Sequence, residues 1–122
     1  MSESKNFLAV FLGNPNQPMM TEWNAMPEAK RQQLMKEGGN AWHAWTEKYK
    51  NNIVFMGSPL GKTKVASKQG IGDVSNALCA YTVVSAASHD EAVRMFENHP
   101  HFAIFPGESV EVMECLPIPP AM

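Results

Sequence analysis

Two histidines separated by a proline, His99-Pro100-His101, follow a helical pattern near the C-terminus of this chain of 122 residues. Imidazole groups transfer protons near neutral pH and bind metal ions. The proline favours an extended backbone at His99, so the two rings can lie on one side of a short segment, as two metal ligands would. A zinc site needs three or four ligands, and no spacing in the sequence identifies a third. We therefore expect no bound metal and no organic cofactor.

His99 is the better candidate for an acid–base group. The pattern places it at the end of a helix, where the negative end of the helix dipole favours imidazolium and can hold the pKa near neutral. The alternative is structural, with His99 capping the last helical carbonyls and Pro100 ending the helix. Asp73, in the Gly-rich polar segment QGIGDVSN, is the best carboxylate for the same site, although turn formation explains it equally well. The candidate catalytic residues are therefore His99 and Asp73.

Other residues are candidates for the wall of a pocket. Trp42 and Trp45 fall with Tyr49 at positions i, i+3 and i+7, and such an aromatic stripe usually packs into the core. Gly57, in the segment GSPLG, could bring backbone amides close to an anionic group, although the spacing of a phosphate loop is missing. No Ser or Cys is spaced with a base and an orienting partner, so nucleophilic catalysis has no support. The remaining pocket candidates are His101, as a rim or loop residue, His43, as an exposed or half-buried helix residue, and Tyr81.

The elements that position these residues alternate between strands and helices. A helix is expected from Pro27, with a stop or kink at the Gly-Gly pair 38–39. Asn40 can cap a second helical stretch, which carries the two tryptophans. Ser88 and Glu91 form a capping-box pattern at the start of a further helix. Strands are expected at residues 7–12, 53–56, 62–67, 78–86 and 110–113, and loops at 13–26 and 69–76.

This order of elements favours a ferredoxin-like α+β sandwich in a single domain over residues 1–122, with a Pro-rich tail at 117–122. The helices of such a sandwich cover only one face of the sheet. The strand runs at 7–12 and 78–86 are apolar on both faces, so the second face needs a cover of its own. The simplest cover is the same sheet of another subunit, and we expect a homodimer through the open sheet face.

Charge and composition argue against several classes of protein. The net charge is −2 and Lys and Arg do not cluster, so neither a nucleic-acid partner nor a membrane surface is expected. The N-terminal apolar run is too short for a membrane span, and the positive region of a signal peptide is missing, which favours the cytoplasm. In that reducing compartment Cys79 and Cys115 are expected to be free thiols.

The chain contains, in this order and spacing, AWHAWTEKYKNNIVFMGSPLG, QGIGDV, AYTVVSAASHDEAVRMFENHPHF and ESVEVMECLP. On these stretches the sequence resembles the YCII-related (YciI-like, DGPF-type) proteins over roughly residues 6–117, its expected core. The resemblance implies a ferredoxin-like subunit that forms a dimeric α/β-barrel. A His/Asp pair has been suggested as catalytic for some members, but His99 stands where many relatives carry an aspartate before the proline, and His43 is out of register with the family's histidine. No His/Asp mechanism is therefore carried over.

Two functional hypotheses follow. The first is an enzyme of small-molecule metabolism, with a pocket between the sheet and the helices and His99 as its acid–base group. The second is a non-catalytic binding or accessory module that holds a small ligand in the same pocket. A third, purely structural possibility is that side chains fill the pocket. The fold class by itself does not choose among them.

Overall fold

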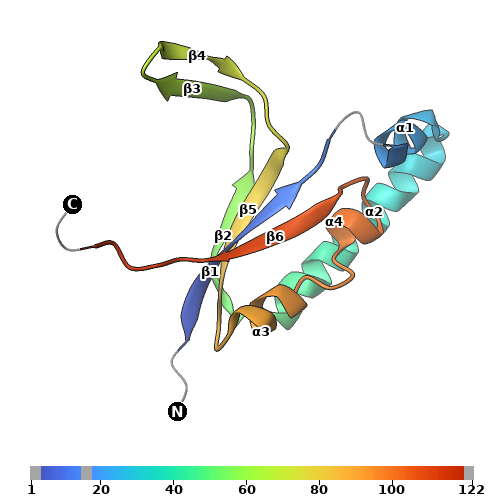
Figure 1. The fold of residues 1–122 in the computed structure, drawn as a ribbon. Coiled ribbons are helices and arrows are strands. Elements are labelled where there is room, and N and C mark those ends of the chain that lie inside the picture. The colour runs from blue at the N-terminus through green and yellow to red at the C-terminus, as the bar shows by residue number, and fades with distance from the viewer. Residues whose placement is uncertain (1–3, 15–17, 120–122) are drawn as a thin grey trace.

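A four-stranded antiparallel sheet with helices on one face forms the body of the protein (Figure 1). The computed structural model describes residues 4–14 and 18–119. The sheet has the order β2-β5-β1-β6, built from β1 (Lys5–Leu12), β2 (Ile53–Pro59), β5 (Leu78–Ala86) and β6 (Ser109–Glu114). The helices are α1 (Pro18–Ala25), α2 (Glu28–Lys48), α3 (His89–Arg94) and α4 (Pro100–Ala103). This strand order, with both helical crossovers on one face, is the ferredoxin-like α+β sandwich, and the expected fold class is confirmed.

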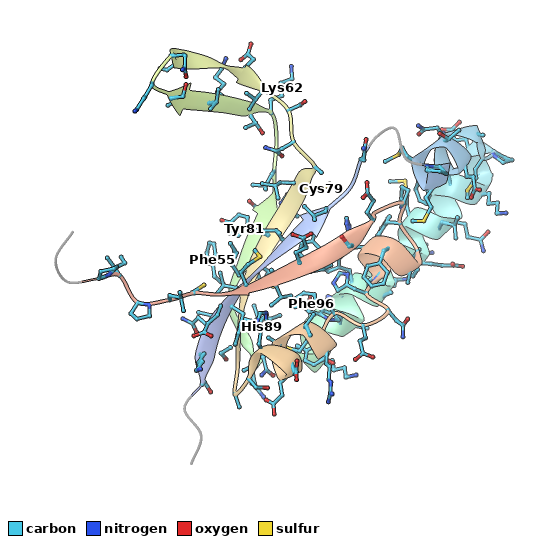
Figure 2. All side chains as sticks on the ribbon, in the orientation of Figure 1. Phe55, Lys62, Cys79, Tyr81, His89 and Phe96 are labelled. Carbon is cyan, nitrogen blue, oxygen red and sulfur yellow. The ribbon has the colours of Figure 1, made fainter. Side chains whose placement is uncertain are left out.

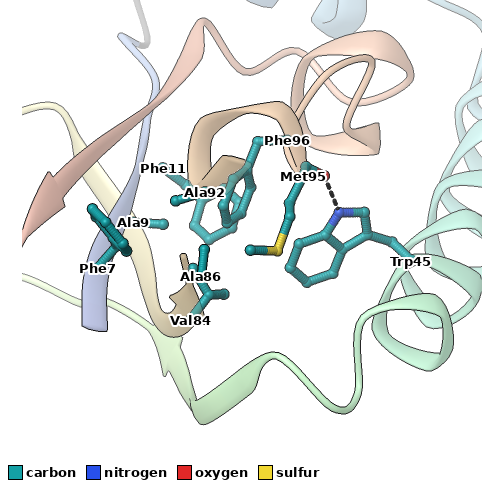
Figure 3. Packing of buried hydrophobic residues seen from close by; sticks show 9 residues of the cluster. All are labelled: Phe7, Ala9, Phe11, Trp45, Val84, Ala86, Ala92, Met95 and Phe96. Carbon is teal, nitrogen blue, oxygen red and sulfur yellow. Dashed lines mark hydrogen bonds between the residues drawn. The ribbon is translucent and has the colours of Figure 1, made fainter. Parts of the chain in front are cut away.

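The core lies on the face of the sheet beneath the helices (Figure 3). Phe11 of β1 contacts the rings of Trp42 and Phe96 at centroid distances of 5.2 and 6.0 Å. Trp45 Nε1 donates a hydrogen bond of 2.6 Å to the carbonyl of Met95, which ties α2 to the segment that follows α3. The expected aromatic stripe of α2 is therefore part of the core. The buried apolar side chains are Phe7, Ala9, Phe11, Trp45, Val84, Ala86, Ala92, Met95 and Phe96.

No helix of the described residues lies on the opposite face of the sheet (Figure 1), and the centre of this face is apolar, although Glu111 of β6 pairs with Val10 there. The register pairs Leu8 with Val83 and Val10 with Tyr81, which places these four side chains on that face. They are half-buried within one chain, and Phe55 at the edge of the same face is 57% exposed. Both faces of the central strands are thus largely apolar, as the sequence indicates, and the helices of the described residues cover only one of them.

Helix α2 runs without interruption from Glu28 to Lys48, so the expected stop at the Gly-Gly pair is wrong. Asn40 lies inside this helix rather than at the start of a second one. Gly38 is buried, and a Cβ there would come within 2.5 Å of the ring of Phe105. This glycine therefore serves a close approach between α2 and the segment after α4, and packing against that ring outweighs its low helix propensity.

The expected loop at 13–26 contains a helix, α1, and its residues 15–17 lie outside the described part of the chain. The end of α1 is held by Arg31 of α2, whose guanidinium donates to the carbonyls of Trp23, Asn24 and Met26 at 3.5, 3.4 and 3.2 Å. A cation near the C-terminal carbonyls of a helix satisfies groups that have no partner within the helix. This stabilisation comes from another helix, and the sequence of 18–25 alone does not reveal it.

A hairpin of β3 (Thr63–Ser67) and β4 (Gly70–Val74) projects from the end of the sheet, away from the helices (Figure 1). The segment 69–76, expected to be a loop, thus contains a strand. Gly70 has a positive φ of 104°, which glycine adopts without strain, and it lies at the turn of the hairpin. The polar, Gly-rich composition that suggests a loop belongs here to the tip and the exposed face of a hairpin.

Strand β2 extends to Pro59, beyond the expected end at residue 56, and it is bulged. Its pairing with β5 shifts register between Phe55 and Ser58, and Gly57 inside this bulge has a positive φ of 70°. A Cβ at Gly57 would collide with the carbonyl of Tyr81. Only glycine therefore fits this position of the strand.

The helix α3 begins as the sequence predicts. The Ser88 hydroxyl accepts from the amide of Glu91 at 3.1 Å, while the Glu91 carboxylate accepts from Ala87, one residue before the position that the capping box predicts. The Pro-rich tail extends without secondary structure to Pro119, and residues 120–122 lie outside the described residues. No helix within the described ranges is both long and apolar enough to span a membrane.

The two adjacent glycines of α2 provide a matched test of this packing. Gly38→Ala is expected to lower the free energy of unfolding by about 1–2 kcal/mol, because the methyl group overlaps the Phe105 ring. Gly39→Ala, which meets nothing within 4 Å, is expected to raise it by about 0.5–1 kcal/mol through helix propensity. Urea denaturation monitored by circular dichroism measures both values. Equal effects of the two substitutions would contradict the close approach of Phe105.

Candidate functional site

A cavity of about 350 Å³ lies between α2 and the sheet, next to the bulge of β2. Its inner wall is aromatic and its outer wall is formed by strands β2 and β5. Figure 2 shows Cys79 and Tyr81 along β5, with Lys62 beyond them at the hairpin. The lining residues are Phe11, Trp42, Trp45, Met56, Gly57, Ser58, Pro59, Cys79, Ala80, Tyr81, Thr82 and His101.

His99 lies behind the aromatic wall rather than at the end of α3. Its side chain is 1% exposed, and it forms the N-cap of α4, where its Nδ1 accepts from the amide of His101 at 3.0 Å. An Nδ1 that accepts is unprotonated, so the neutral ring carries its proton on Nε2. The predicted role in capping the carbonyls of the preceding helix is therefore wrong, because His99 caps the amides of the following one.

The Nε2 of His99 is buried and has no hydrogen-bond partner among the described residues. The ring stands edge-on to the indoles of Trp42 and Trp45, with centroids 4.5 and 4.9 Å away. The pKa of His99 is lowered to about 3. Burial away from water is the larger cause, and the nearby His101 is the smaller one. The expectation of a pKa near neutral does not hold, since desolvation outweighs any helix dipole at this position.

His101 is buried and lines the cavity, rather than lying at an exposed rim. Its Nε2 donates to the carbonyl of Leu12 at 2.8 Å, because a carbonyl oxygen can only accept. Burial lowers the pKa of His101, while the bond to Leu12 opposes that shift. The backbone of Gly107 lies directly against the imidazole, where a Cβ would collide with ring atoms. His101 is thus a neutral side chain held in one orientation.

The cavity brings together Trp42, Trp45, Gly57, Tyr81 and His101 of the residues singled out in the sequence. Each lies on α2, on β2, on β5 or at the start of α4. The i, i+3 spacing on α2 explains why Trp42 and Trp45 lie on the same side of the cavity. The bulge at Gly57 explains how the β2 backbone reaches it.

Besides His99, two further candidates lie outside the cavity. Asp73 is exposed on the hairpin strand β4 and pairs with Lys64 at 2.7 Å, and it does not line the cavity. His43 is exposed on α2.

The sequence reasoning missed several lining residues. Thr82 is buried, and its hydroxyl donates to the carbonyl of Phe55 at 2.9 Å. Cys79 is half-buried, and burial together with the charge of Glu108 raises the pKa of its thiol. Ala80 faces the cavity as a small residue between larger ones. The two-residue period of a strand indicates which side chains of β5 face the helices. It does not indicate which residues of other elements lie across the cavity from them.

The chemistry of the cavity is that of a neutral, mostly apolar compartment. None of its lining side chains is a Lys, Arg, Asp or Glu. Across residues 4–14 and 18–119, no group of three or more His, Cys, Asp or Glu side chains is arranged to hold a metal ion. Both cysteines are free thiols. The arrangement can enclose an uncharged molecule and offer it a few hydrogen bonds.

A comparison with solved structures supports the fold. No protein-family model and no curated protein sequence matches the chain. The 5-chloro-2-hydroxyhydroquinone dehydrochlorinase TftG of Burkholderia phenoliruptrix AC1100, solved with 2,5-dihydroxybenzoquinone, is similar with a TM-score of 0.50 and 18% identity, over 88% of this chain and 89% of that one. A protein described as a putative antibiotic biosynthesis monooxygenase, from Bacteroides thetaiotaomicron, matches with 13% identity and a TM-score of 0.34. The match covers 98% of this chain and 94% of that one. The likeness to TftG establishes the fold, and any ligand of this chain has to be argued from its own side chains.

The buried His99 predicts a specific dependence of stability on pH. Above about pH 6.5 histidine is neutral in both the folded and the unfolded chain. As the pH falls below that value, the unfolded chain binds a proton that folded His99 excludes until about pH 3, so the free energy of unfolding decreases. The loss approaches about 1.4 kcal/mol per pH unit for one such group, and His101 acts in the same direction.

Urea denaturation between pH 7 and pH 5 measures this slope before most carboxylates titrate. His99→Asn keeps an acceptor for the His101 amide and removes the titrating ring. Unfolding of this variant is expected to take up as much as one proton fewer, so its free energy of unfolding changes less steeply with pH. The exposed His43→Gln serves as the control and is expected to retain the slope of the parent protein. A parent protein of equal stability at pH 7 and pH 5 would show that His99 is not buried in neutral form.

Proposed function

We propose that this protein binds a small, uncharged, planar molecule in the cavity between α2 and β2, as a homodimer. The observation that carries the proposal is the composition of the wall, where Trp42, Trp45 and Phe11 surround a neutral, fixed His101. Aromatic and apolar linings with a few positioned polar groups are the usual features of small-molecule sites. At about 350 Å³ the cavity suits a compound of one or two rings.

The absence of charge among the lining residues supports an uncharged ligand. Taking a carboxylate out of water without a cation to pair with it is unfavourable by several kcal/mol or more. His101 does not provide that cation, because its burial favours the neutral ring. A neutral phenol or ketone, by contrast, needs only one hydrogen bond and a stacking surface.

The position of His99 favours binding over acid–base catalysis. A general base has to come within hydrogen-bond reach of the proton that it removes. His99 does not line the cavity, its Nδ1 is occupied by the His101 amide, and its lowered pKa makes it a weak base. Asp73 lies on the hairpin and pairs with Lys64. We therefore favour the non-catalytic alternative, with His99 as a structural part of the pocket wall.

The open face of the sheet supports the homodimer. Leu8, Val10 and Val83 form an apolar strip there, and Phe55 and Met113 on the same face are 57% and 40% exposed. Contiguous apolar surface of this kind usually marks an interface. The order of motifs along the chain supports a relationship to the YCII-related proteins, whose subunits are expected to pair in this way, and the two free cysteines fit a cytoplasmic protein.

Ligand binding can be tested by quenching of tryptophan fluorescence. A Trp23→Phe background leaves Trp42 and Trp45 as the reporters, both at the cavity. We expect 4-ethylphenol to bind at least tenfold more tightly at pH 7 than 4-ethylbenzoate, which has a similar shape and a charge.

Ala80→Phe fills the cavity from β5 and is expected to abolish the quenching, whereas His43→Ala on the exposed side of α2 serves as the control. Equal affinity for the phenol and the benzoate, or quenching that survives Ala80→Phe, would contradict the proposed site.

The dimer can be tested by light scattering coupled to size exclusion. The parent protein is expected to elute with twice the mass of one chain. Met113→Lys places a charge on the open face and is expected to shift the equilibrium to monomer, since an unpaired charge in an apolar interface is strongly unfavourable. Met35→Lys, at an exposed methionine of α2, is the matched control and is expected to remain dimeric. A monomeric parent protein would rule out the interface.

A further inference from the structure

A second cavity, of about 290 Å³, adjoins the first. It lies between the end of β1, helix α1 and the segment that follows α4. Its lining includes no Lys, Arg, Asp or Glu, so it is apolar like the first cavity. The two cavities share two lining residues, Cys79 and His101. The residues that line only the second are Gly13, Met20, Phe105, Pro106 and Gly107.

The two shared side chains differ in how firmly they are held. His101 is fixed by its hydrogen bond to Leu12 and by the backbone of Gly107 against its ring. Among the described residues, the Cys79 thiol lies within hydrogen-bonding reach of two carbonyl oxygens, that of Gly13 at 3.8 Å and that of Ala77 at 3.6 Å from its sulfur. A thiol is a weak hydrogen-bond donor, and one rotation about its Cα–Cβ bond moves the sulfur without disturbing the backbone. Cys79 is therefore the movable part of the partition.

We propose that the two cavities are the two compartments of one binding site, with the Cys79 thiol as the partition between them. The ligand class is an uncharged molecule with an aromatic head and an apolar tail of several carbons. The head lies among Trp42, Trp45 and Phe11, and the tail passes the thiol toward Met20. This inference rests on the function proposed above, because it assigns a shape to the ligand of the same site.

The walls of the second compartment explain the apolar tail. Met20 and Phe105 present apolar side chains, and methionine adapts its shape to whatever lies beside it. Gly13 leaves room beside the thiol, since a Cβ there would lie only 3.1 Å from the sulfur. The raised pKa of Cys79 keeps the thiol neutral, so it interrupts neither the apolar character nor the passage between the compartments.

The experiment compares two probes, 4-ethylphenol and 4-hexylphenol, by quenching of tryptophan fluorescence on the Trp23→Phe background. The measured quantity is the ratio of their dissociation constants. Each methylene that leaves water contributes up to about a fourfold gain in affinity. We expect the parent protein to bind the hexyl compound at least tenfold more tightly than the ethyl compound. Cys79→Ala, which removes the sulfur, is expected to increase this ratio about threefold or more.

Two further variants reduce the space for the tail, one at the partition and one in the second cavity. Cys79→Leu enlarges the partition, and Met20→Trp fills the far compartment, so each is expected to bring the ratio close to one. Cys115→Ala changes the exposed cysteine outside both cavities and is the matched control for the loss of a thiol. Circular dichroism identifies any variant that fails to fold. Met20→Trp tests the passage without altering β5, and because its new indole adds a third fluorophore, its two dissociation constants are measured by calorimetry.

The outcomes separate this inference from the function on which it rests. If 4-ethylphenol does not bind the parent protein, the proposed function fails and the compartments fail with it. If 4-ethylphenol binds and the ratio stays the same in the Cys79 and Met20 variants, the first cavity is the whole site and only the second compartment is wrong. A ratio that rises in Cys79→Ala and falls in both Cys79→Leu and Met20→Trp supports one continuous site.

Discussion

The structure depends on one buried imidazole, that of His99. Its ring packs against Phe11 of β1, Trp42 and Trp45 of α2, and Phe96 after α3, at centroid distances between 4.5 and 5.8 Å. Through Nδ1 it also sets the start of α4. A single side chain thus joins the first strand, the long helix and the last crossover. The ring has to be neutral for this, because a charged imidazole without a counter-ion would be strongly destabilised in such surroundings.

The wall of the cavity follows from that arrangement. Once His99 caps α4, the next ring along the chain, that of His101, lies against Phe11 at 5.3 Å and reaches the carbonyl of Leu12. Gly107 then has to be a glycine, since any side chain would occupy the space of the imidazole. The His-Pro-His segment is therefore a corner between helix and strand and also a wall of the cavity. Proline serves both roles, because it begins α4 at a position that needs no amide donor.

The sequence predicts the parts of this structure that local rules control. Unbroken apolar runs identify β1 and β5, Ser88 identifies the start of α3, and the spacing of Trp42 and Trp45 identifies the buried face of α2. The strand order then follows from the usual topology of such elements. These parts suffice for the fold class and for the aromatic side of the cavity.

The features that the sequence does not reveal depend on contacts between distant residues. Gly38 resembles a helix stop until Phe105 is known to pack on it, and α1 resembles a loop until Arg31 is known to cap it. The position of His99 near a helix end does not reveal its pKa, because desolvation among rings of β1, α2 and the segment after α3 is the main cause of its lowering. Asp73 was assigned to the site from loop composition, but the β3–β4 pairing carries it onto the hairpin.

The bulge of β2 links the two surfaces on which the proposed function depends. Register places Tyr81 on the open face of the sheet, opposite Val10 and Ser58, yet Tyr81 also lines the cavity. Both are possible because β2 carries an extra residue at Gly57, so the edge strand leaves the regular plane of the sheet there. Phe55, whose ring lies 6.1 Å from that of Tyr81, belongs to the open face alone. A partner that covers Phe55 would therefore also constrain Tyr81, and any coupling between dimerisation and ligand binding in this protein has to pass through this edge of the sheet.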